Sequence, residues 1–88
     1  MNNTLFLLIS CSLDKTRDEV FDKVSKNLIR KNKKFKFFHN LLVFDNASTQ
    51  LKTLNCLKLF PNVLKCNKNI GLWSAVSWSL NNYKKYFK

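Results

Sequence analysis

The stretch from Leu41 to Ser48, LLVFDNAS, constrains the fold of this chain more than any other. A run of large apolar residues ends abruptly at an acid, and small polar residues follow it. Such a run is typical of a parallel strand that is buried on both faces and ends at a ligand-facing loop. A related loop, Asn67–Gly71 (NKNIG), follows about one helix and one strand later. The carboxyl ends of successive parallel strands share one edge of the sheet, and in open α/β sheets nucleotides and sugars bind at that edge.

Strands and helices are predicted to alternate along the whole chain. The expected strands are Leu5–Cys11, His39–Asp45 and Val63–Cys66. The expected helices run from Thr16 to near Arg30–Asn32, from Ser48 or Thr49 to about Phe60, and from Gly71 to about Tyr86. This order implies parallel pairing with right-handed crossovers. We therefore expect one α/β domain over residues 1–88, with the strand ends at Cys11, Asp45 and Asn67 opening on one side.

Apolar residues at helical spacing indicate the buried face of each helix. The first helix is expected to begin with a capping box, Thr16–Glu19. Its inner face would be Val20, Phe21, Val24, Leu28 and Ile29. The second helix would bury Leu51, Leu54, Leu57 and Phe60. The third would bury Leu72, Ala75, Val76, Leu80 and Tyr83, which leaves Trp73 and Trp78 off its inner stripe.

The net charge is +11, from 16 Lys and Arg against 5 Asp and Glu. Such a charge attracts nucleotide phosphates, nucleic acid or acidic lipid without choosing among them. The chain is rich in Lys, Asn, Phe and Leu, a composition that AT-biased coding produces. The charge alone is therefore not a functional signal.

The segment Arg30–Phe38, RKNKKFKFF, mixes bases with aromatic residues. It could track a nucleic-acid backbone or lie on an anionic membrane. The favoured alternative is a solvated helix end that leads into a strand, because charge runs usually face solvent.

Cysteine and histidine content predicts no catalytic or metal centre. Cys11, Cys56 and Cys66 lack the spacing of a metal knuckle, and His39 is the only histidine. The cysteines also have no recognisable base partner for nucleophilic catalysis. Reduced thiols in a cytoplasmic protein are the expected state, with the membrane surface as a second possible location.

The segment Leu8–Cys11 resembles a lipoprotein cleavage box. Against export, no Lys or Arg precedes it, and the apolar run is shorter than that of a signal peptide. A first β-strand is the favoured interpretation, and a lipid anchor at Cys11 is the alternative.

The two loops that follow the second and third strands carry the candidate ligand contacts. Asp45 can accept a hydrogen bond from a uracil imide or a ribose hydroxyl. Ser48 can cap the following helix, whose first amides favour an anion. In the second loop, Lys68 could meet a phosphate, Asn69 could cap the third helix, and Gly71 could supply an unusual backbone angle. The alternative is that these residues only cap helices.

Taken together, LLISCS, LLVFDNAST and CNKNIGLWSAVSWSL resemble the start of a family-2 glycosyltransferase with the GT-A, nucleotide-sugar-binding fold. The resemblance implies an incomplete Rossmann-like half-domain that binds a nucleotide-diphospho-sugar donor, for example a UDP-sugar. Nucleic acid is then not the expected partner. The implied nucleotide-binding residues are Ser10, Cys11 and Ser12 at the base, Asp45 and Asn46 at the base and ribose, and Asn69 and Gly71 in the Asn-x-Gly motif. Ser48, in the same loop as Asp45, is also a predicted nucleotide-binding residue.

The chain also departs from that family's pattern. Ser10 and Ser12 stand where a proline and an aromatic residue are usual, Gln50 replaces an acid, and Ser77 replaces an asparagine. The family's metal-binding Asp-x-Asp and its acceptor half would follow Lys88. No cofactor is therefore expected within these residues, and the chain is expected to be inactive alone. The fourth strand of the family's sheet would pair with the first, so we expect Leu5–Ile9 to be an open edge that recruits a partner chain or a second copy.

Overall fold

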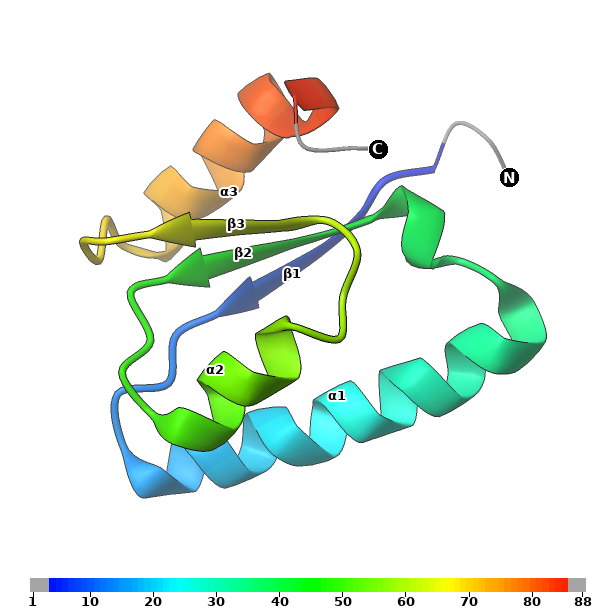
Figure 1. Cartoon of the computed structure of the whole chain (residues 1–88). Coiled ribbons are helices and arrows are strands. Elements are labelled where there is room, and N and C mark those ends of the chain that lie inside the picture. The colour runs from blue at the N-terminus through cyan, green and yellow to red at the C-terminus, as the bar shows by residue number, and fades with distance from the viewer. Residues whose placement is uncertain (1–3, 86–88) are drawn as a thin grey trace.

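The computed structural model describes residues 4–85 and confirms the alternation of strands and helices (Figure 1). The strands are β1 (Phe6–Ser10), β2 (Leu41–Asn46) and β3 (Val63–Cys66). The helices are α1 (Lys15–Phe35), α2 (Leu51–Leu57) and α3 (Leu72–Asn82). Short 3-10 turns, η1 (Phe38–Asn40) and η2 (Tyr83–Lys85), precede β2 and follow α3.

Within residues 4–85 the three strands form one parallel sheet in the order β1-β2-β3, as expected. Ser10 lies opposite Asp45, and Asn46 lies opposite Cys66, so all three strands end at one edge. Helices α1 and α2 cover one face of the sheet and α3 covers the other (Figure 1). Because β2 lies between two strands and two helical layers, every one of its residues is buried.

The main core lies between the sheet and the layer of α1 and α2. Its buried members are Phe21, Phe38, Leu41, Val43, Cys56, Leu57 and Phe60. On the other face, Phe44 packs against Trp78 of α3, with 6.0 Å between the ring centroids. The fully buried Ala75 and Ser79 give α3 a ridge of small side chains toward the sheet. The expectation that Trp78 lies off the inner stripe was therefore wrong, whereas Trp73 is exposed as expected.

Helix α1 begins and ends at different residues from those predicted. Its cap is Asp14, whose carboxylate accepts the N–H of Arg17 at 2.8 Å, and not the Thr16–Glu19 box. The helix continues past Asn32 to Phe35, because the sequence holds no breaker there. It ends where Lys36 adopts a left-handed conformation with φ of 54°.

The inner face of α1 is also more polar than predicted. Asp18, Phe21 and Ser25 are buried, and Leu28 and Ile29 pack against the core as expected. Val20 and Val24 are instead 56% and 38% exposed. The helix is rotated because Asp18 turns toward the start of α2, where its charge finds hydrogen-bond donors.

Strand β3 has the predicted bounds, whereas β1, β2 and α2 are shorter than predicted. His39 lies in η1 and not in β2, and α2 ends at Leu57, although Phe60 is buried as expected. Leu51 is exposed on the outer side of α2. Leu72 and Leu80 of α3 are exposed too, because the small residues of this helix face the sheet. Helix α3 ends at Asn82, and the predicted end at Tyr86 lies outside the described residues.

Among the described residues β1 pairs with β2 alone, so its other edge has no strand beside it. Phe6 on this strand is 41% exposed. The expected association through β1 stays a prediction. None of the helices in residues 4–85 has the length and apolar character needed to cross a bilayer.

Candidate functional site

The carboxyl edge of the sheet, here called the rim, gathers the loops that follow β1, β2 and β3 (Figure 1). All of the predicted site residues lie on it. They are Ser10, Cys11, Ser12, Asp45, Asn46, Ser48, Asn69 and Gly71. Hydrogen bonds join the three loops to one another, so the rim is a connected structure.

Ser48 joins the first loop to the second. Its hydroxyl oxygen accepts the backbone N–H of Ser12 at 2.8 Å and lies 3.4 Å from the hydroxyl oxygen of Ser10. The backbone N–H of Thr49 donates to the carbonyl of Ser12 at 3.0 Å. The prediction that Ser48 caps the second helix was therefore wrong, because its hydroxyl is used between loops.

The amino end of α2 is capped by a residue of α1. The Asp18 carboxylate accepts the backbone N–H of Thr53 at 2.6 Å and that of Lys52 at 3.3 Å. Asp18 is buried, and the hydroxyl of Thr53 donates to that of Ser12 at 2.6 Å. The anion that we expected at these amides is thus a side chain of the protein, and a phosphate cannot bind there without displacing it.

Asp45 is the carboxylate at the centre of the rim and is 2% exposed. Its Oδ2 atom accepts the backbone N–H of Ser48 at 3.3 Å. Its Oδ1 atom is enclosed and has no hydrogen-bond partner among the described residues. A buried acceptor without a donor is energetically costly, so this oxygen is a candidate acceptor for a ligand N–H or O–H. Ala47, two residues further along the chain, has a φ of 64°.

Asn46 ties the third loop to the sheet. It is 2% exposed, its Oδ1 accepts the N–H of Ile70 at 2.9 Å, and its Nδ2 donates to Oδ1 of Asn69 at 3.1 Å. Both ends of the Asn46 amide are therefore used inside the protein. A direct contact of Asn46 with a ligand stays a prediction.

Asn69 and Cys11 are the solvent-facing partners of the rim. Asn69 is exposed, accepts the N–H of Gly71 at 2.8 Å, and donates through Nδ2 to the Cys11 sulfur at 3.4 Å. It does not cap α3, whose cap residue is Gly71. Gly71 has a φ of 83°, and a Cβ there would meet no atom within 4 Å. The expectation of an unusual backbone angle at Gly71 is confirmed, and conformation rather than space requires the glycine.

Sequence reasoning missed Asp18, Thr53 and Ala47 at this site. A signal for Asp18 was present, because Asp18, Phe21 and Ser25 recur at helical spacing on one face of α1. Apolar spacing alone does not find this face, because two of its three residues are polar. Nothing local marks Thr53 or the left-handed turn at Ala47.

A hollow of about 360 Å³ adjoins the rim on the α3 side of the sheet. Its lining combines apolar and polar side chains: Phe44, Leu64, Lys65, Cys66, Asn67, Ile70 and Trp78. Among residues 4–85 no three His, Cys, Asp or Glu side chains gather so that they could hold a metal ion.

Comparisons with protein-family models, with curated proteins and with solved structures each found no match.

Proposed function

We propose that the rim binds the nucleotide part of a nucleoside-diphosphate sugar, as in the donor-binding half of a glycosyltransferase. The observation that supports this most is Asp45, a buried carboxylate with one unpartnered oxygen at the carboxyl edge of a parallel sheet. Loops from all three strands lie at the same edge of the sheet and are hydrogen-bonded to one another. This is the position at which open α/β sheets bind nucleotides.

In this proposal, Asp45 accepts the imide N–H of a uracil or a ribose hydroxyl. Oδ1 has to become accessible for this contact, and the hydrogen bond that Asp45 makes through Oδ2 to the N–H of Ser48 is long, at 3.3 Å. Cys11 and Asn69 border the bound nucleoside, while Asn46 holds Asn69 in place. Lys68 lies in the same loop as Asn69, and the first backbone amides of α3 follow Gly71. These groups bind the phosphates of the nucleotide.

The proposal is one of binding and not of sugar transfer by these residues. Of the two buried carboxylates at this site, Asp18 binds the first amides of α2 and Asp45 is assigned to the nucleotide, so neither is assigned to acid or base catalysis. Transfer would need the metal-binding and acceptor parts that the resemblance places beyond this chain.

The test is isothermal titration of the 88-residue chain with UDP, UDP-sugars and inorganic phosphate. We expect weak binding of UDP and a loss of roughly tenfold in affinity for Asp45→Asn, because the uncharged amide is the poorer acceptor. Asn69→Ala should weaken binding as well. The matched control is Asn81→Ala, an exposed asparagine near the end of α3 and far from the rim. Circular dichroism checks that each variant is folded.

Equal affinity of the parent chain and folded Asp45→Asn for UDP would remove Asp45 from the site. Equal affinity for ADP and UDP, together with loss of both in Lys68→Gln, would reduce the rim to a general anion site.

A further inference from the structure

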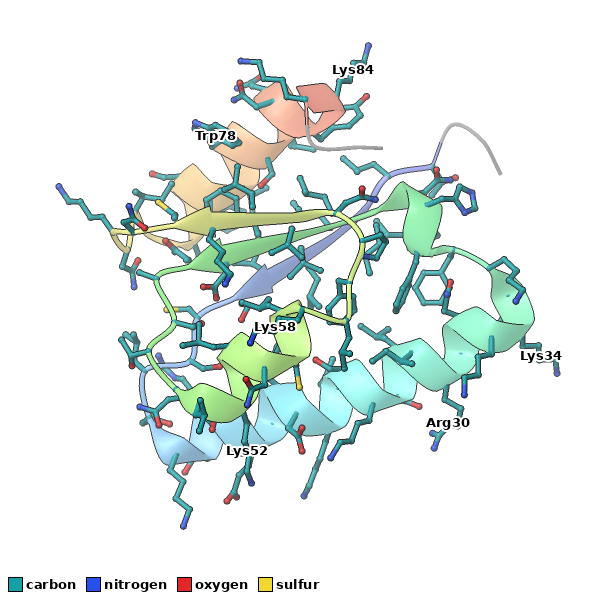
Figure 2. All side chains as sticks on the ribbon, in the orientation of Figure 1. Arg30, Lys34, Lys52, Lys58, Trp78 and Lys84 are labelled. Atoms are coloured by element: carbon teal, nitrogen blue, oxygen red, sulfur yellow. The ribbon has the colours of Figure 1, made fainter. Side chains whose placement is uncertain are left out.

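The carboxyl-terminal end of α1 carries a concentrated positive charge. This basic end consists of Arg30, Lys31, Lys33, Lys34 and Lys36, all of them exposed. The sequence has no acid between Asp22 and Asp45, and among the described residues none of the five cations forms an ion pair. Figure 2 shows Arg30 and Lys34 projecting outward from α1 at the end of the molecule opposite the rim. Their charge is therefore available to a partner.

Two phenylalanines of this segment pack against other aromatic rings, and one is exposed. Phe37 contacts Phe6 and Phe38, with 5.6 and 5.2 Å between ring centroids, and Phe38 reaches the core through Phe60 at 5.1 Å. Phe35 stands outside this series and is 66% exposed. Its ring contacts the ammonium of Lys34, 5.4 Å from the centroid. The left-handed turn at Lys36 separates the exposed ring from the two packed rings, because it directs the chain back toward the sheet.

A largely apolar hollow of about 510 Å³ lies beside this exposed ring. The apolar side chains that line it are Phe6, Leu28, Phe35 and Phe37, and the polar ones are Lys36, His39 and Asn40. Phe6 is itself 41% exposed. An accessible apolar surface is thus bordered by unpaired cations.

We propose that the basic end binds the surface of an anionic phospholipid bilayer. Phe35 and the apolar side chains that line the hollow enter the boundary between headgroups and acyl chains. The surrounding lysines bind the lipid phosphates. An exposed apolar group set among cations is the combination that interfacial binding requires. A single-stranded nucleic acid is favoured less, because it needs several exposed rings for stacking, and two of the three rings in Phe35–Phe38 are engaged in packing.

The test is co-sedimentation of the whole chain with vesicles of phosphatidylcholine alone or mixed with phosphatidylglycerol. Binding should need the anionic lipid and should weaken as salt is raised. The double variant Lys31→Gln/Lys34→Gln should partition roughly 30-fold less, since each lysine near an anionic surface contributes about a fivefold effect. Phe35→Ala should reduce partitioning roughly tenfold, because the apolar contribution of the ring is lost.

Matched controls remove the same groups elsewhere. Lys84→Gln/Lys85→Gln removes two exposed lysines from η2, and Trp73→Ala removes an aromatic ring that is 80% exposed. Neither should change partitioning by more than about twofold. Equal binding to neutral and anionic vesicles would overturn the proposal, as would an equal loss in the controls. Salt-sensitive binding of single-stranded RNA without vesicle binding would overturn it in favour of a nucleic-acid partner.

Discussion

The carboxylate of Asp18 on α1 accepts the backbone N–H of Thr53 on α2 at 2.6 Å, so the first helix caps the second. Thr53 also fixes the loop after β1, because it donates its hydroxyl to Ser12. One buried acid therefore connects helix packing to the rim.

Replacing this acid should destabilise the fold. Asp18→Asn keeps the size of the side chain but removes the charge that holds two backbone N–H groups. We expect a loss of about 2 kcal/mol in the free energy of unfolding, measured by urea denaturation. Glu19→Gln removes the same charge from an exposed neighbour and should cost less than about 0.5 kcal/mol. Similar losses in the two variants would contradict the capping role.

The amide group of Asn46 should be required for stability, and a side chain of the same size should not replace it. In Asn46→Asp a carboxylate oxygen replaces Nδ2 and faces Oδ1 of Asn69, 3.1 Å away, in a site that is 2% exposed. The variant should lose about 3 kcal/mol of stability, because a buried donor becomes a buried charge. Asn67→Asp makes the same change at an exposed position of the third loop and serves as the control. Thermal unfolding at neutral pH compares them.

The side chain of Asn32 should be required where α1 ends. Its Oδ1 accepts the N–H groups of Phe37 and Phe38, both at 2.8 Å. Asn32→Ala leaves these donors without that acceptor and should cost about 2 kcal/mol in chemical denaturation. Asn27→Ala removes only an exposed contact to Arg30 and should cost less than about 0.5 kcal/mol.

Glycine at position 36 should stabilise the protein. Lys36 has a φ of 54°, a conformation that side chains with a Cβ disfavour. Lys36→Gly should therefore raise the free energy of unfolding by about 0.5 kcal/mol, after allowing for the greater freedom of glycine in the unfolded chain. Lys34→Gly, two residues earlier and inside the helix, should lower it by about 1 kcal/mol. A loss of stability in both variants would show that the Lys36 side chain contributes to the fold.

The Cys56 thiol should make stability fall at alkaline pH. Burial raises the pKa of this thiol, and the Asp22 carboxylate, 3.4 Å from the sulfur, raises the pKa further. The folded state thus favours the protonated thiol. Its contribution is complete below the ordinary thiol pKa of roughly 8.5 and is lost as pH rises through the raised pKa of the folded state. The stability difference between the parent chain and Cys56→Ala should accordingly shrink across that range, as measured by denaturation at each pH.

The fold could be predicted because its strongest signals are local. The apolar run Leu41–Phe44 and its abrupt end at Asp45 indicate a buried central strand, and the structure places β2 there with both neighbours parallel. Gly71 marked the turn before α3 for a conformational reason that is visible in the sequence.

The predictions that were wrong concern side chains whose orientation depends on residues far away in the sequence. Hydrophobic spacing placed Val20 and Val24 inward, but the contact between Asp18 and Thr53 rotates α1 away from that orientation. Local preference likewise made Ser48 a helix cap, whereas the hydroxyl accepts from Ser12 in another loop. A polar side chain with several possible partners cannot be assigned until the tertiary structure has brought those partners together.

The hydrogen bonds that assemble the rim join Cys11 to Asn69, 58 positions apart, and Ser12 to Ser48, 36 positions apart. Loops of this length close late in folding, because their entropic cost precedes the contacts that offset it. A nascent chain on the ribosome could order β1, α1 and β2 while Asn69 is still inside the exit tunnel. The rim would then be completed only after Asn69 has left the ribosome, later than the pairing of β1 with β2.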